Sequence, residues 1–226
     1  MTISSNNNFF AGIALLTSVL FSSCEKNDID NSGQFHLKIV NASPTAGAQT
    51  FTLAGNVLVS NGLNYKESSA YITSASGTRL VAEFKNQGTN SIYASGEIWT
   101  ANNINQTVYL AGQGSKARVK VFTDDLAAPN NNQVKVKFID FSDNGPSVVK
   151  IENGTGDDLV SSLARNEDSG YKYVAAGTFT VQIKGLTGTN NANTFVVPNL
   201  QAGKIYTIYF TDAADGGMVV NTVQHN

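Results

Sequence analysis

Two stretches of the chain repeat each other at a spacing of one hundred residues, and this repeat constrains the fold most. Each copy begins with a tyrosine, passes through a Gly-Thr pair and ends in a Gly-Thr-Asn turn. The matching positions are Tyr71 and Tyr171, Gly77-Thr78 and Gly177-Thr178, and Gly88-Thr89-Asn90 and Gly188-Thr189-Asn190. Gly and Asn mark turns around a strand, so the repeated unit is a β element inside a duplicated domain.

Apolar residues alternate with polar ones in both copies, which is the period of a half-buried strand. Phe179, Val181 and Ile183 alternate in the second copy, but a fixed offset of one hundred would place Arg79 and Glu83 in a core. Because a slip of one residue moves every side chain to the other face of a sheet, the inward set of the first copy is predicted to be Leu80, Ala82 and Phe84. The extra residue is expected near Gly77, as a turn change or bulge.

The spacing of strands and turns predicts two tandem immunoglobulin-like antiparallel β-sandwiches, each with about seven short strands. Thr123–Gln133 has the composition of a linker and separates the halves, and Leu159–Leu163 is the one stretch where a helical turn would fit. The predicted segments are a lipoprotein signal peptide at 1–23, an acidic tether at 24–34, one sandwich at 35–127 and another at 128–226.

The N-terminal segment predicts export and a lipid anchor. Phe9–Phe21 is apolar but shorter than the ~20 residues of a membrane span, which suits the core of a signal peptide. Ser22-Ser23 precede Cys24, the only cysteine of the chain, and this resembles the lipobox of Bacteroidetes-type lipoproteins. The resemblance implies lipid attachment at Cys24 in the outer membrane, exposed on the cell surface or facing the periplasm. The alternative is a soluble secreted protein in which Cys24 is simply buried.

Charge limits the partners of the chain. Charged residues make up only 14% of the sequence and the formal net charge is -2, so no broad basic surface is expected and nucleic acid is excluded as a partner. The acidic residues after Cys24 resemble the surface-export signal of such lipoproteins, and a plain linker is the alternative. The expected partners are the membrane, through the lipid, and a polysaccharide or another surface protein.

Short motifs at equivalent places in both copies resemble the bacterial domain of unknown function 4397. The first copy has Asn41-Ala42-Ser43-Pro44-Thr45 and later Ser76-Gly77, and the second has Asp140-Phe141-Ser142-Asp143-Asn144 and later Ala175-Ala176-Gly177. A Gly-x-x-Tyr-Thr motif of that family appears as Gly203-Lys204-Ile205-Tyr206-Thr207. The resemblance implies an immunoglobulin-like, all-β architecture in secreted or anchored proteins, and it implies no known activity.

No catalytic motif is found in the sequence. Asp140, Ser142 and Asn144 are spaced like the start of a calcium loop, but the bidentate glutamate required at the twelfth position is Ile151, so an ordinary turn is favoured. The two histidines, His36 in a strand and His225 beside the C-terminus, are expected in solvent. We therefore predict that the protein is not an enzyme and that it uses no cofactor.

Aromatic residues are the remaining candidates for a ligand site. Trp99 is the only tryptophan, and Tyr171 and Tyr173 lie close together in the second copy. Such rings stack on sugar faces in many sandwiches, although for Trp99, which closes the run Ile92–Trp99, a core or inter-domain position is favoured. The leading hypothesis is a surface-anchored, non-catalytic binding or structural module. A carbohydrate-binding component of a glycan-utilisation system and an adhesin-like or fibre-associated subunit are the alternatives.

Overall fold

The structure is a computed structural model that describes residues 27–89, 91–130, 132–187, 192–213 and 215–226. Within these ranges no helix is long and apolar enough to span a bilayer. The regular elements are β1 Asp28–Asn41, β2 Gln49–Leu53, β3 Asn56–Leu63, β4 Ile72–Thr78, β5 Leu80–Asn86, β6 Ile92–Ile98, β7 Asn105–Ala111, the 3-10 helix η1 Gly114–Lys116, β8 Arg118–Asp124, β9 Gln133–Asp140, β10 Val148–Asn153, β11 Asp158–Ala164, β12 Asp168–Ala175, β13 Gly177–Gly185, β14 Ala192–Leu200, β15 Ile205–Asp212 and β16 Met218–Gln224.

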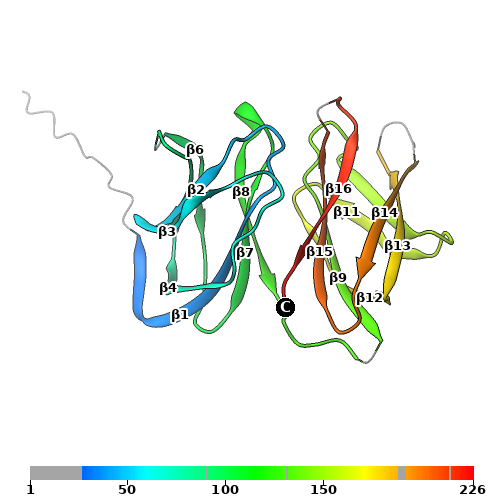
Figure 1. Ribbon diagram of the computed structural model, residues 1–226, viewed down its shortest axis with the longest axis horizontal. Helices are drawn as coiled ribbons and strands as arrows, with labels where there is room; N and C mark the ends of the chain where they lie inside the picture. Colours follow the sequence, from blue (N-terminus) through cyan, green and yellow to red (C-terminus); the bar gives the residue numbers. More distant parts are fainter. Residues whose placement is uncertain (1–26, 90, 131, 188–191, 214) are drawn as a thin grey trace, which may run out of the picture.

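The strands form four sheets, two in each half of the chain, so the prediction of all-β sandwiches is confirmed. The first half contains the sheets β4-β1-β7-β8 and β3-β2-β5-β6, and the second half contains β12-β9-β15-β16 and β11-β10-β13-β14 (Figure 1). The pairing departs from the expected antiparallel pattern at one place in each half, because β1 runs parallel to β7 and β9 runs parallel to β15. These parallel neighbours are far apart in sequence, which is why turn signals do not reveal them.

Each sandwich encloses its own apolar core between its two sheets. In β5, Leu80, Ala82 and Phe84 are buried, and in β13, Phe179, Val181 and Ile183 are buried. The predicted slip of one residue between the copies is therefore confirmed. The first copy accommodates its extra residue at Arg79, which has a φ of 59°.

The segment before the first sandwich differs from the prediction. Residues 28–34 were expected in an acidic tether at 24–34, but β1 begins at Asp28 and pairs with β4 from there. The sandwich thus starts before residue 35. The segment lacks the apolar alternation that predicts a strand, and it is a strand because it pairs with β4. Leu159–Leu163, where a helical turn would fit, lies in strand β11. The predicted signal peptide and Cys24 fall outside the described residues.

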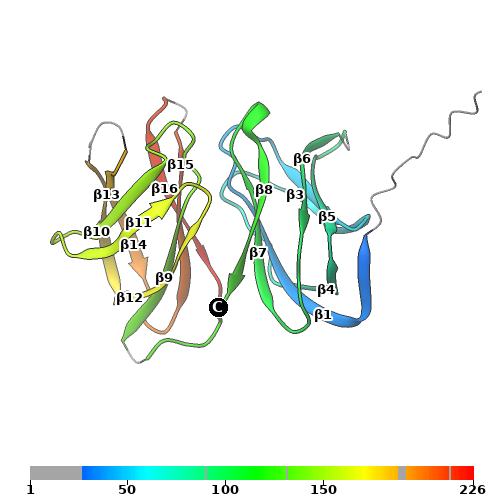
Figure 2. The same ribbon diagram turned by 180° about the vertical axis from the view of Figure 1, so that it is seen from behind.

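The two sandwiches pack face to face, with β4-β1-β7-β8 against β12-β9-β15-β16 (Figures 1 and 2). Tyr109 of β7 and Tyr209 of β15 meet at the centre, with ring centroids 5.8 Å apart in an edge-to-face arrangement. The apolar part of this contact consists of Val40, Ala42, Tyr109, Ala111, Ile139, Phe141, Tyr209 and Val223, with Phe122 packed against it. Equivalent faces of the two copies are therefore in contact, as in the isologous interface of a symmetric dimer.

A polar network lies at one side of this apolar contact. The Asp124 carboxylate, which is fully buried, accepts hydrogen bonds from Lys137 Nζ at 3.0 Å, from Tyr71 Oη at 2.9 Å and from Thr107 Oγ1 at 2.5 Å. Tyr71 Oη is also 2.8 Å from His225 Nδ1. Three of these residues belong to the first sandwich, and Lys137 and His225 belong to the second, so the network ties the two copies together.

His225 is part of this interface, although its place in the sequence predicts a solvated tail. Its Nε2 is 2.8 Å from Thr207 Oγ1, and only 5% of the residue is exposed. Burial lowers the pKa of the imidazole to about 4, against the opposing effect of the nearby Asp124 carboxylate. The histidine is therefore neutral at pH 7 and acts as a hydrogen-bonding partner within the interface.

Candidate binding site at the open end of the second sandwich

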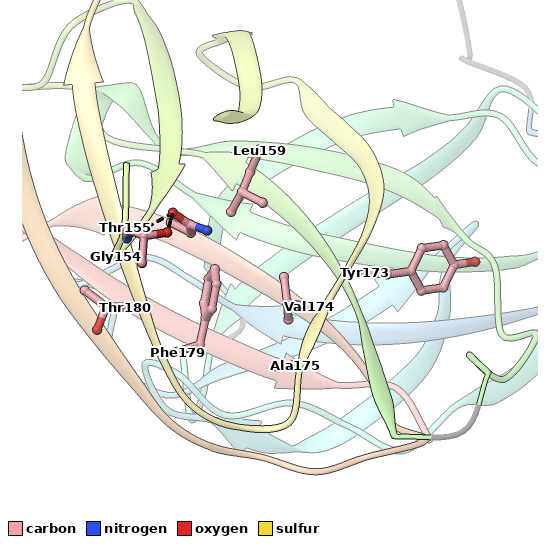
Figure 3. Close-up of a pocket in the computed structure, with 9 residues that line it drawn as sticks. Gly154, Thr155, Leu159, Tyr173, Val174, Ala175, Phe179 and Thr180 are labelled. Atoms are coloured by element: carbon pink, nitrogen blue, oxygen red, sulfur yellow. Dashed lines mark hydrogen bonds between the residues drawn. The ribbon is translucent and has the colours of Figure 1, made fainter. Parts of the chain in front are cut away.

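A hollow with a volume of about 580 Å³ lies at one end of the second sandwich. It is lined by Asn153, Gly154, Thr155, Leu159, Tyr173, Val174, Ala175, Phe179 and Thr180. Figure 3 shows the side chains of Leu159, Val174 and Phe179 pointing toward one another, while the Tyr173 ring points away from them. The hollow thus exposes the end of the core between the two sheets.

The rim formed by the β10–β11 hairpin is held by its own hydrogen bonds. Asn153 Oδ1 accepts from Thr155 N at 3.0 Å, from Thr155 Oγ1 at 2.7 Å and from Asp157 N at 2.8 Å. Hydrogen bonds from Asn153 and Thr155 hold the pKa of Asp157 below its usual range. This side of the hollow is therefore preorganised, which lowers the entropy lost when a ligand binds.

The corresponding end of the first sandwich is closed by the start of the chain. Asp28, Ile29 and Asp30 pair with Thr78, Gly77 and Ser76, and Asn27 Oδ1 accepts a hydrogen bond from Val81 N at 2.8 Å. Ser76 is consequently 2% exposed. In the second sandwich, Ala175, Ala176, Gly177 and Thr178 are all exposed. The hollow thus exists because the second copy lacks the strand segment that covers this end in the first.

The three aromatic candidates from the sequence do not form one site. Trp99 lies between β6 and β7 of the first sandwich and is 61% exposed, so the favoured prediction of a core position is wrong. Tyr173 is 54% exposed at the rim of the hollow. Tyr171 faces the interface instead, where Lys135 Nζ lies 4.6 Å and Lys137 Nζ lies 5.1 Å from its ring centroid. Their different environments arise from the packing of two domains, which sequence spacing does not reveal.

The segment that resembles a calcium loop is a turn organised around Asp212. Asp140 Oδ1 accepts from Ser142 N at 2.9 Å, and Asp212 Oδ1 accepts from Ser142 Oγ at 2.6 Å and from Asn144 N at 3.1 Å. Burial raises the pKa of Asp140 to about 6. No group of three or more His, Cys, Asp or Glu side chains suited to a metal ion is found among the described residues.

The fold defines this chain as a tandem β-sandwich protein with an open hollow in its second sandwich. A family model, "Domain of unknown function (DUF4397)", matches residues 35–150. The chain belongs to this family. The match covers the first sandwich from residue 35 onward and extends into β10 of the second.

Similarity to solved structures is weak. The Bacillus anthracis TIE protein is 10% identical with a TM-score of 0.26, and the match covers 85% of this chain but only 44% of that one. The family CBM26 module CBMbc from Eubacterium rectale Amy13K, in complex with maltoheptaose, is 10% identical with a TM-score of 0.29 and coverages of 84% and 97%. A putative cell adhesion protein from Bacteroides uniformis is 11% identical with a TM-score of 0.30 and coverages of 86% and 98%. No curated protein matches the chain.

Proposed function

We propose that this protein is a non-catalytic binding module that takes its ligand in the hollow at the end of its second sandwich. The observation that carries this proposal is the contrast between the two copies, because only the first is closed by its own chain. Leu159, Val174 and Phe179 supply an apolar floor, and Asn153 and Thr155 supply polar groups at the rim. A concave apolar surface with a few fixed polar groups is the usual form of a ligand site.

The proposal includes a lipid anchor at Cys24 that displays the module at the cell surface. Its support is the apolar run Phe9–Phe21 before the single cysteine. The described chain starts on the side of the first sandwich that is remote from the second (Figure 1). An anchor at the N-terminus would therefore leave the hollow on the sandwich farther from the membrane. Lipid labelling of the full chain is expected to be lost in Cys24→Ala, and retained membrane partitioning of that variant would contradict the anchor.

The binding site is tested by filling the hollow. Ala175→Trp adds a large ring at an exposed position of the lining, and Val196→Trp adds the same ring at a position that is 57% exposed on β14 and outside the lining. The full chain is screened against a glycan array and a panel of surface proteins. Any ligand found is expected to be lost with Ala175→Trp and retained with Val196→Trp. Ligands unaffected by Ala175→Trp would contradict the proposed site.

A carbohydrate is a second candidate ligand because two aromatic rings are exposed. Tyr173 is at the rim of the hollow, and Trp99 is a separate platform on the first sandwich. A glycan that stacks on Tyr173 is expected to lose about 1–2 kcal/mol of binding free energy in Tyr173→Ala, since ring stacking and buried area are both lost. Trp99→Ala is the matched comparison, and a glycan affected by Trp99→Ala alone would place the sugar site on the first sandwich.

A further inference from the structure

The first sandwich shows what kind of chain segment fits this end of the fold. Asp28–Asp30 lie in extended conformation, in antiparallel register with Ser76–Thr78. Thr78 Oγ1 donates a hydrogen bond to Asp28 Oδ2 at 2.8 Å. A Cβ added to Gly77 would lie 2.2 Å from Asp28 O and 3.1 Å from Ile29 Cα, so the segment packs directly on this glycine. The occupant is thus an aliphatic residue between two acidic ones, held by strand pairing.

The second sandwich presents the corresponding segment, 176–178, without an occupant among the described residues, although β12 ends at Ala175 and Gly177 has a φ of 111°. The pairing of β12 with β9 ends at Ala175 and Gln133, and the next three residues are exposed. A Cβ added to Gly177 would meet no atom within 4 Å, in contrast to Gly77. The linker does not continue along this edge, because the backbone carbonyls of Asp125 and Ala127 accept hydrogen bonds from Lys135 Nζ at 3.0 and 3.1 Å.

We propose that this edge binds an extended segment of a partner polypeptide, in which an aliphatic residue is flanked by acidic ones. The inference rests on the proposed function and names the ligand class for the same hollow. The segment would continue the β9–β12 pairing, as Asp28–Asp30 continue the pairing of β1 with β4. Strand addition of this kind takes its affinity from main-chain hydrogen bonds and its specificity from alternate side chains.

The internal precedent supplies the register proposed for the complex. The first acidic residue of the segment lies opposite Thr178, whose hydroxyl would donate to its carboxylate as Thr78 does to Asp28. The aliphatic residue lies opposite Gly177, as Ile29 does opposite Gly77. Covering this end would also complete the burial of Phe179, which is 9% exposed, whereas Leu80 at the equivalent position is 1% exposed.

The register can be tested by disulfide trapping with a defined probe. The probe is a synthetic peptide with the sequence of residues 27–34, in which Asp28 is replaced by Cys. The full chain carries Cys24→Ser, which removes its only thiol, together with Thr178→Cys. Val196→Cys, at an exposed position outside the hollow, is the matched control. Directly opposed residues of antiparallel strands lie within the Cα separation that a disulfide requires.

In a glutathione redox buffer, the mixed disulfide with Thr178→Cys is expected to exceed that with Val196→Cys by at least about tenfold, because docking raises the local thiol concentration. A peptide that also carries Ile29→Asp is expected to react equally at both positions. Adding Ala175→Trp to the Thr178→Cys chain should remove the excess. Equal trapping at positions 178 and 196 by the unmodified probe would overturn the proposal.

Two other occupants give different results. A second copy of this chain would produce a concentration-dependent dimer in sedimentation that Ala175→Trp dissociates, and this result would overturn the assignment to a partner polypeptide. A glycan that binds in the hollow without any peptide trapping would also overturn it, while leaving the proposed function intact. If neither peptide nor any array ligand responds to Ala175→Trp, the proposed function fails together with this inference.

Discussion

The two sandwiches have the same strand order but differ in how one end is finished. In the first, Asp28–Asp30 extend β1 along β4 and bury Ser76. In the second, β9 begins at Gln133, and the end of the core remains open as a hollow of about 580 Å³. The difference amounts to one short strand segment. It teaches that one of two similar sandwiches can have a hollow because it lacks an element that the other retains.

The copies also differ where they meet. Asp124 in the first copy and His225 in the second occupy equivalent positions. Asp124 pairs with Asn105 of β7, and His225 N donates a hydrogen bond to the carbonyl of Ile205 at the equivalent position of β15. Thr107 donates to Asp124, and Thr207 contacts His225 in the same way. Lys38 and Lys137 are likewise equivalent, but only Lys137 Nζ donates to a carboxylate. The two faces in this interface are equivalent in fold but differ in charge. The first face carries the Asp124 carboxylate where the second carries His225, and Lys137 of the second face donates to that carboxylate.

The largest expected effect tests this charge complementarity at the two equivalent lysines. Lys137→Met leaves the buried Asp124 carboxylate without its cation, and removing one partner of a buried ion pair costs about 3–5 kcal/mol. Lys38→Met removes one hydrogen bond to Ser69 O, at 3.1 Å, and should cost about 1 kcal/mol. Urea unfolding at pH 7 measures both. Equal losses would show that the two lysines do not differ in role.

The second prediction concerns the buried His225 and its pH dependence. Its pKa in the folded protein is about 4, against 6.5 for the free side chain, so the unfolded chain takes up a proton first as pH falls. The contribution of His225 to stability is complete above pH 6.5 and is lost between about pH 6.5 and 4, amounting to roughly 3 kcal/mol. His225→Gln should remove this loss.

The measurement is the free energy of unfolding of His225→Gln relative to the parent chain, from urea titrations between pH 4 and 7. His36→Gln, at the other histidine of the chain, controls for the substitution itself. If the difference between His225→Gln and the parent does not change with pH, the imidazole is not the buried neutral group described above.

The third prediction exchanges the residues at another matched pair, Asn41 and Asp140. Asn41 Oδ1 accepts from Ser43 N, and its Nδ2 donates to Gly47 O and Leu63 O, whereas Asp140 Oδ2 is buried without a protein partner in the described part of the chain. Burial raises the pKa of Asp140 from 3.8 to about 6, so its ionisation weakens the fold as pH rises between these values. Asp140→Asn should therefore stabilise the protein at pH 7 by up to about 3 kcal/mol.

This effect has the opposite pH slope to that of His225. The advantage of Asp140→Asn should disappear as pH falls from about 6 to 3.8, because Asp140 is then protonated in both states. Asn41→Asp is the reciprocal variant and should destabilise at pH 7 by a similar amount. Thermal melts at pH 7 and pH 4 compare the two, and destabilisation by Asp140→Asn at pH 7 would refute the equivalence of these positions.

Alternation along the sequence was sufficient to predict the cores but not the interface. Period-2 patterns place Leu80 and Phe179 inward, and both are buried. The same pattern predicts solvent for Lys38 and Lys137, because it separates the two faces of a strand but does not reveal that the polar face packs on another domain. The resemblance to the family 4397 domain was confirmed, whereas the hollow could not be predicted. It arises because the second copy lacks a counterpart of Asp28–Asp30, a segment whose charges predict a tether.

The smallest expected effect concerns Trp99, which directly follows β6 in the first sandwich. The second copy has no matching ring there, because Val197, the counterpart of Ile98, is followed by Pro198 and Asn199. Trp99 is 61% exposed, and exposed substitutions usually change stability by less than about 0.5 kcal/mol. Trp99→Asn should therefore leave the thermal midpoint nearly unchanged. A large loss would mean that the ring stabilises the first sandwich, and the argument that it is available as a ligand platform would then fail.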